Sequence, residues 1–124
     1  MGTGSKRDQE GTAAQWQAWG DVGAGGKLYV AYYDRGRGAC EATGCNDITL
    51  AVSGNNGLDW HRRRITTSSM PNLTCEINPF QCGFLGDYMS LRAQFGRVYI
   101  AWGDTRGRGG TVEEDVYYAR VRQS

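Results

Sequence analysis

The stretch that decides the fold is Gly26–Asp34, Gly-Lys-Leu-Tyr-Val-Ala-Tyr-Tyr-Asp, because it occurs twice. The second copy, Gly96–Asp104, reads Gly-Arg-Val-Tyr-Ile-Ala-Trp-Gly-Asp and begins 70 residues after the first. Gly, Tyr, Ala and Asp are identical between the copies, and four further positions carry similar residues. A second matched pair follows, with Asp47–Ala51 in the first unit and Asp115–Ala119 in the second. A repeat of this size indicates a fold built from successive similar units.

Each copy is predicted to be a β-strand in the middle of a sheet. Side chains alternate between the two faces of a strand, and in Leu28–Tyr33 both alternating sets are apolar or aromatic. A strand with one face in water would alternate apolar and polar residues instead. A helix is disfavoured because the run is short, is bounded by glycine, and is rich in β-branched and aromatic residues. We therefore expect both copies to be central strands covered on two sides.

The remaining pattern predicts seven strands in two units. The first unit is expected to have four strands, at Trp16–Val22, Lys27–Asp34, Asp47–Ser53 and Trp60–Ile65. The second is expected to have three, at Asp87–Ala93, Arg97–Asp104 and Asp115–Val121.

The chain is expected to divide into four segments. Residues 1–12 are predicted to be a polar leader or tag without regular structure. Residues 13–65 form the first unit, residues 66–86 a long connection, and residues 87–124 the second unit, which lacks an outer strand. Arg62–Arg64 suits an edge strand, where charge discourages pairing with other sheets.

Composition argues against several classes of function. The 124 residues carry a net charge of +1, and Lys and Arg are spread along the chain. This distribution gives no support to a nucleic-acid partner or a membrane surface. The longest apolar run, Leu28–Tyr33, is far too short to cross a bilayer. Arg-Gly-Arg-Gly occurs twice, but two short loops inside a repeat are not a low-complexity RNA-binding tract.

The turn after the third predicted strand carries a family motif. It matches the pattern Ser-x-Asp-x-Gly-x-x-Trp at Ser53, Asn55, Gly57 and Trp60. Asn55 stands where the pattern has Asp, and Asp59 where it commonly has Thr. With the repeat and the strand order, this motif makes the chain resemble the Asp-box (BNR) blades of sialidase-like β-propellers.

The resemblance covers roughly residues 15–122 and implies an all-β fold. It implies two consecutive four-stranded antiparallel blades, the second incomplete, of a six-bladed propeller. A propeller closes with four to eight blades, so the remaining blades, or self-association, would complete it. In the family the Asp box is structural.

The long connections are expected to gather polar residues at one end of the sheets, since binding residues favour long loops on a rigid scaffold. Sialidases of this family use an arginine triad, a Tyr–Glu nucleophile pair and an Asp acid/base. The resemblance makes Asp87 and Tyr88 weak catalytic candidates, and the predicted ligand-binding residues are Asp34, Arg35, Asp104 and Arg106. Arginine binds a carboxylate through a bidentate fork. The competing interpretation is that these Asp and Arg residues are turn and ion-pair residues repeated for structure.

The four cysteines are predicted to form disulfides. The spacing Cys75-x6-Cys82 is wider than the Cys-x2–4-Cys pairs typical of zinc sites, and Cys40-x4-Cys45 lies at the upper limit of that range. Three connectivities are open, of which we favour Cys40–Cys45 with Cys75–Cys82. Disulfides indicate an oxidising compartment, so the protein is expected to be secreted or otherwise extracytoplasmic. The lone His61 has no ligand partner in spacing, and we expect no metal and no cofactor.

The resulting functional hypothesis is a fragment of a secreted sialidase-like propeller that binds a glycan and is not catalytic alone. The alternative is a structural or protein-binding module with no carbohydrate site. The absence of a Phe-Arg-Ile-Pro motif, where the family often places one triad arginine, argues against catalysis by this chain.

Overall fold

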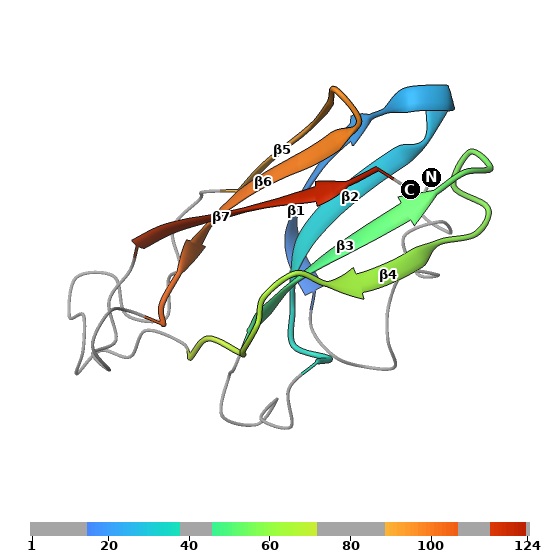
Figure 1. The fold of residues 1–124 in the computed structure, drawn as a ribbon. Helices are drawn as coiled ribbons and strands as arrows, with labels where there is room; N and C mark the ends of the chain where they lie inside the picture. The colour runs from blue at the N-terminus through green and yellow to red at the C-terminus, as the bar shows by residue number, and fades with distance from the viewer. Residues whose placement is uncertain (1–14, 38–45, 72–88, 107–114, 124) are drawn as a thin grey trace.

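The computed structural model describes residues 15–37, 46–71, 89–106 and 115–123, which form two antiparallel β-sheets (Figure 1). The first sheet has the order β1-β2-β3-β4 and comprises β1 (Gln15–Val22), β2 (Leu28–Asp34), β3 (Asp47–Ser53) and β4 (His61–Arg64). The second has the order β5-β6-β7 and comprises β5 (Met89–Gln94), β6 (Arg97–Asp104) and β7 (Asp115–Arg122). One 3-10 turn, η1 (Ala24–Gly26), is the only helical element among the described residues. The all-β prediction is confirmed, and each predicted strand is present.

The repeated stretches form the central strands of the two sheets. β2 lies between β1 and β3, and β6 lies between β5 and β7. One face of each strand is buried almost completely, comprising Tyr29, Ala31 and Tyr33 in β2 and Val98, Ile100 and Trp102 in β6. On the other face Leu28 and Val30 of β2, and Tyr99 and Ala101 of β6, are only half-buried, whereas Tyr32 of β2 is buried. Both central strands were expected to be covered on two faces. The structure covers one face of each strand almost completely and the other face only in part.

The buried faces of the two sheets pack against each other and make one core. Ile48 and Leu50 of β3 join it from the first sheet, and Met89 and Leu91 of β5 join it from the second. The sheets approach most closely where β1 and β2 lie against β5.

Two hydrogen bonds join the sheets across this contact. The backbone N–H of Ala93 donates to Asp21 Oδ2 at 2.9 Å. The hydroxyl of Tyr33 donates to the carbonyl oxygen of Gly103 at 2.7 Å. Both partners in the second bond belong to the repeated stretch, so the two copies touch at matched positions.

The short turns join strands at one end of the sheets, and the long connections start at the opposite end. Leu28 pairs with Ser53 and Gln94 with Arg97 at the short-turn end. The β5–β6 turn has two residues with positive φ, Phe95 at 54° and Gly96 at 71°, as the tightest hairpins require.

At the other end, Asp34 pairs with Asp47 and Asp104 pairs with Asp115. The long connections therefore start from one shared end of the sheets, as the sequence predicted. Several predicted residues lie outside the described part of the chain, namely residues 1–12, Cys40, Cys45, Cys75, Cys82, Asp87 and Tyr88.

Candidate functional site

The Asp-box turn between β3 and β4 is held by its own side chains. Ser53 is 1% exposed, and its hydroxyl accepts from the backbone N–H of Gly57 at 2.8 Å. The indole N–H of Trp60 donates back to the carbonyl oxygen of Gly57 at 3.1 Å. Gly57 has φ of 85°, a left-handed conformation that costs glycine little. These contacts close the turn on itself and favour a structural role for the motif.

The two departures from the Asp-box pattern contact each other. The side-chain amide of Asn55 donates to Asp59 Oδ2 at 2.8 Å, and Asn55 Oδ1 accepts from the backbone N–H of Asp59 at 2.8 Å. An aspartate at position 55 would place its carboxylate beside that of Asp59, and like charges repel. An asparagine at position 55 therefore suits an aspartate at position 59, a pairing that sequence reasoning had treated as two separate departures.

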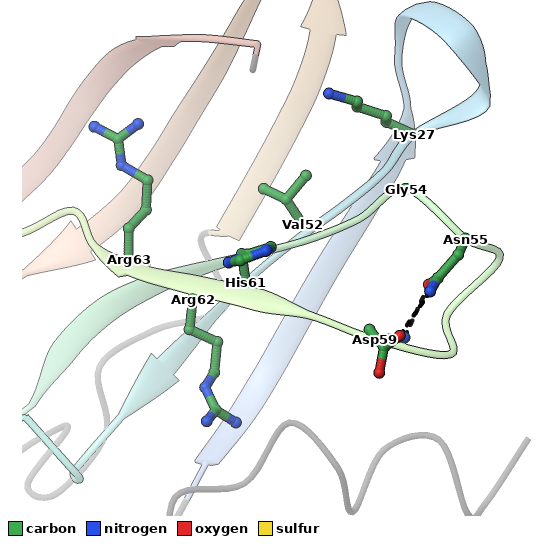
Figure 2. A pocket seen from close by; sticks show the side chains of 8 residues that line it. All are labelled: Lys27, Val52, Gly54, Asn55, Asp59, His61, Arg62 and Arg63. Atoms are coloured by element: carbon green, nitrogen blue, oxygen red, sulfur yellow. Dashed lines mark hydrogen bonds between the residues drawn. The ribbon is translucent and has the colours of Figure 1, made fainter.

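A groove of about 630 Å³ lies beside this turn (Figure 2). Its lining is largely polar or basic and comprises Lys27, Val52, Gly54, Asn55, Asp59, His61, Arg62 and Arg63. The side chains of Arg62 and Arg63 extend to opposite sides of β4, as Figure 2 shows, because neighbouring residues on a strand alternate. The cationic groups do not converge on one point, so the groove lacks the arrangement expected of an anion-binding site.

The predicted ligand-binding residue Asp34 is buried at the end of β2 and has several partners. It is 0% exposed, and its carboxylate accepts from the backbone N–H of Gly36 and from the hydroxyl of Thr49, both at 2.8 Å. Arg37 Nε lies 3.8 Å from Asp34 Oδ2. The carboxylate therefore fixes the turn that leaves β2.

Asp104 repeats this arrangement at the end of β6. It is 0% exposed and accepts from the backbone N–H of Arg106 at 2.9 Å, two residues along the chain as in Asp34. Its second oxygen accepts from the indole N–H of Trp102 at 2.8 Å and from Arg106 Nη2 at 2.7 Å. The shared contact from the residue two positions on favours the interpretation that these aspartates are repeated for structure.

Arg106 is held from three sides. Its guanidinium lies 4.8 Å from the ring centre of Tyr117 and donates to the hydroxyl of Thr67 at 3.1 Å. The hydrogen bond to Asp104 raises the pKa of Arg106 above its ordinary value, so the group stays charged. The other predicted arginine, Arg35, is half-buried and donates through Nε to Asn46 Oδ1 at 3.1 Å.

A third buried carboxylate, Asp47, joins the same end of the molecule. It is 1% exposed and accepts from Arg64 Nε at 2.9 Å and from the hydroxyls of Thr66 and Ser69. The stretch 66–69, Thr-Thr-Ser-Ser, therefore contacts Asp47 through its outer residues and Arg106 through its inner ones. Sequence reasoning assigned this stretch to a connection; its run of four hydroxyls was the signal for a polar partner.

Where the structure describes the end from which the long connections start, the buried carboxylates thus form a network in which each has hydrogen-bond or ion-pair partners. Each of the three buried aspartates accepts at least three polar contacts, which suits a rigid scaffold better than proton transfer. Among the residues that the structure describes, no group of three or more His, Cys, Asp or Glu side chains could hold a metal ion. In the same part of the chain, no helix has the length and apolar character needed to cross a membrane.

Comparison with known proteins adds no assignment. No family model, no characterised protein and no solved structure matches this chain. A function can therefore be inferred only from the repeat, the turn motif and the geometry of the two sheets.

Proposed function

We propose that this chain supplies two consecutive blades of a sialidase-type β-propeller and acts as a non-catalytic, glycan-binding module of a secreted protein. The observation that carries the proposal is the repeated aspartate turn. Asp34 and Asp104 end equivalent central strands and accept the same backbone contact in two sheets packed face to face. The closed Asp-box turn at the opposite end supports the same assignment.

The contacts of the buried carboxylates support the proposed lack of catalysis. A general acid or base must reach a proton on the substrate, whereas Asp34 and Asp104 are fully buried and already bonded. A glycan would instead meet the rim that these residues support. Arg35 is the best-placed described side chain for it, because it is half-buried and comes directly after the end of β2.

The second candidate function is a structural or protein-binding module without a carbohydrate site. It is favoured by the contacts of Arg106, whose guanidinium is engaged by Asp104, Tyr117 and Thr67. A guanidinium held in this way has little left to offer a ligand carboxylate.

Two measurements separate these functions. A fluorogenic sialoside assay should show no turnover; turnover that Tyr88→Phe abolishes would contradict the non-catalytic assignment. Binding to an array of sialylated and neutral glycans should be positive and should weaken in Arg35→Ala but not in the control Arg92→Ala, which alters an exposed arginine on β5. Absence of binding to any glycan would favour the structural module.

A further inference from the structure

The outer face of the second sheet, which we call the β5–β7 outer face, exposes large side chains. Tyr118 is 70% exposed and Val116 is 62% exposed, and Trp19 of β1 reaches the same surface with 53% exposure. Trp19 and Tyr118 border a shallow depression of about 340 Å³ that also includes Ser90, Arg92, Tyr99 and Ala101. Large exposed apolar patches mark interaction surfaces.

The repeat shows what this face is equivalent to. Tyr99 and Ala101 correspond to Tyr29 and Ala31 in the first copy, which are 1% and 0% exposed in the core. In the second matched pair, Tyr118 corresponds to Leu50, which is 1% exposed. The residues of the β5–β7 outer face therefore occupy positions of the repeat whose counterparts in the first sheet are buried against the second sheet.

The outer face of β1 and β2 is the complement. Leu28 and Val30 correspond to Val98 and Ile100, which the second sheet buries at 0% and 1% exposure. Val22 pairs with Leu28 in the first sheet and Ala93 pairs with Val98 in the second, so Val22 corresponds to Ala93. Val22 is 58% exposed. Each of the two outer faces thus matches one of the two faces that already pack together inside the chain.

We propose that a second copy of this chain docks the outer face of its β1 and β2 on the β5–β7 outer face, head to tail. The contact would repeat the packing of the two sheets within one chain. A head-to-tail contact uses two different surfaces of each copy, and it produces a ring if the rotation closes and a filament if it does not. The proposal depends on the repeat and not on glycan binding.

Charge favours this arrangement over pairing of two identical faces. The β5–β7 outer face carries Arg92 and Arg120 in one row with Tyr99, and its described residues include no carboxylate. Pairing this face with itself would bring the arginines of two copies onto one interface. The outer face of β1 and β2 instead presents Val22, Leu28 and Val30, so docking this face there brings no second set of arginines to the interface.

The contact between copies should be weaker than the one inside the chain. The internal contact has polar anchors at Asp21 and Tyr33. On the β5–β7 outer face, Arg92 is the counterpart of Asp21, because Arg92 pairs with Tyr99 and Asp21 pairs with Tyr29. Gly103 is the counterpart of Tyr33 in the repeat. Neither can make the bond of its counterpart, since arginine accepts no hydrogen bond and glycine has no side chain. Association should therefore depend on protein concentration.

Sedimentation velocity over a concentration series tests the proposal. Wild type should associate, whereas Tyr118→Arg and Val22→Arg should each remain monomeric at concentrations where wild type is assembled. Leu58→Arg is the matched control, because Leu58 is 61% exposed in the Asp-box turn and is a residue of neither face. It should associate as wild type does, and circular dichroism should show that all variants are folded.

A mixture of the two variants gives the sharper result. Tyr118→Arg retains an intact β1–β2 face and Val22→Arg retains an intact β5–β7 face, so an equimolar mixture should form a 1:1 dimer that cannot grow. Folded wild type that stays monomeric throughout the series would overturn the proposal. Association abolished by Tyr118→Arg but unaffected by Val22→Arg would also overturn it, because it would indicate pairing of identical faces.

Discussion

Asn55 and Asp59 show how one contact accounts for two departures from a motif. The amide of Asn55 gives Asp59 a hydrogen-bond donor where an aspartate would give it a second negative charge. The turn geometry remains that of a closed box, with Ser53 and Trp60 bonded to Gly57. The substitutions are therefore expected to be coupled, each acceptable because of the other.

Asn55→Asp should destabilise the protein by about 1 kcal/mol, since it replaces a hydrogen bond with a repulsion between carboxylates. The double variant Asn55→Asp with Asp59→Thr should recover most of this loss. Urea unfolding of both single variants and the double variant, as a double-mutant cycle, measures the coupling. Additive effects would show that the two residues act independently.

At the level of elements, the central strands organise the core. β6 contributes Val98, Ile100 and Trp102 to it, and Trp102 also donates its indole N–H to Asp104. One side chain thus links the apolar packing of a strand to the polar turn that ends it.

Trp102→Ala should lower the free energy of unfolding by about 3–5 kcal/mol, the usual cost of removing a large buried aromatic. Trp102 is 2% exposed, whereas Trp19 is 53% exposed. Trp19→Ala is therefore the matched control and should cost much less. Thermal or urea unfolding monitored by circular dichroism compares the two, and equal losses would contradict the assigned burial.

The strands could be predicted from the sequence because their signals are local. Alternating apolar residues, glycine-bounded turns and the repeat placed all seven strands and the end from which the long connections leave. The partners of the aspartates could not be predicted in the same way. Thr49 reaches Asp34 across 15 positions, and Thr66 reaches Asp47 across 19. Such contacts depend on sheet register and on how a connection folds back, which residue spacing does not show.

At the level of the whole molecule, Asp21 joins β1 to the second sheet. The backbone N–H of Ala93, and then that of Val22, lower the pKa of Asp21 below its ordinary value of 3.8. Hydrogen bonds to the charged form favour that form. The stabilising contribution of this carboxylate is therefore complete above pH 3.8 and is lost as the pH falls through the folded-state pKa.

Asp21→Asn should consequently lower the melting temperature at neutral pH, and the difference from wild type should shrink as the pH falls below about 4. Differential scanning fluorimetry of both proteins over this pH range measures it. A difference that stays constant down to the lowest pH would mean that the charge of Asp21 has no part in joining the sheets.

The bond between Tyr33 and Gly103, 70 residues apart, also bears on how the chain folds. All hydrogen-bonded strand neighbours in the described sheets are consecutive in sequence, so each sheet can form from short-range contacts at little cost in loop closure. Docking of the two sheets is different, because it requires contacts between distant residues and hides the only extensive core of the described residues. Neither sheet retains a buried core by itself, and we expect amide protons of β2 and β6 to exchange with solvent together, in one cooperative opening of the molecule.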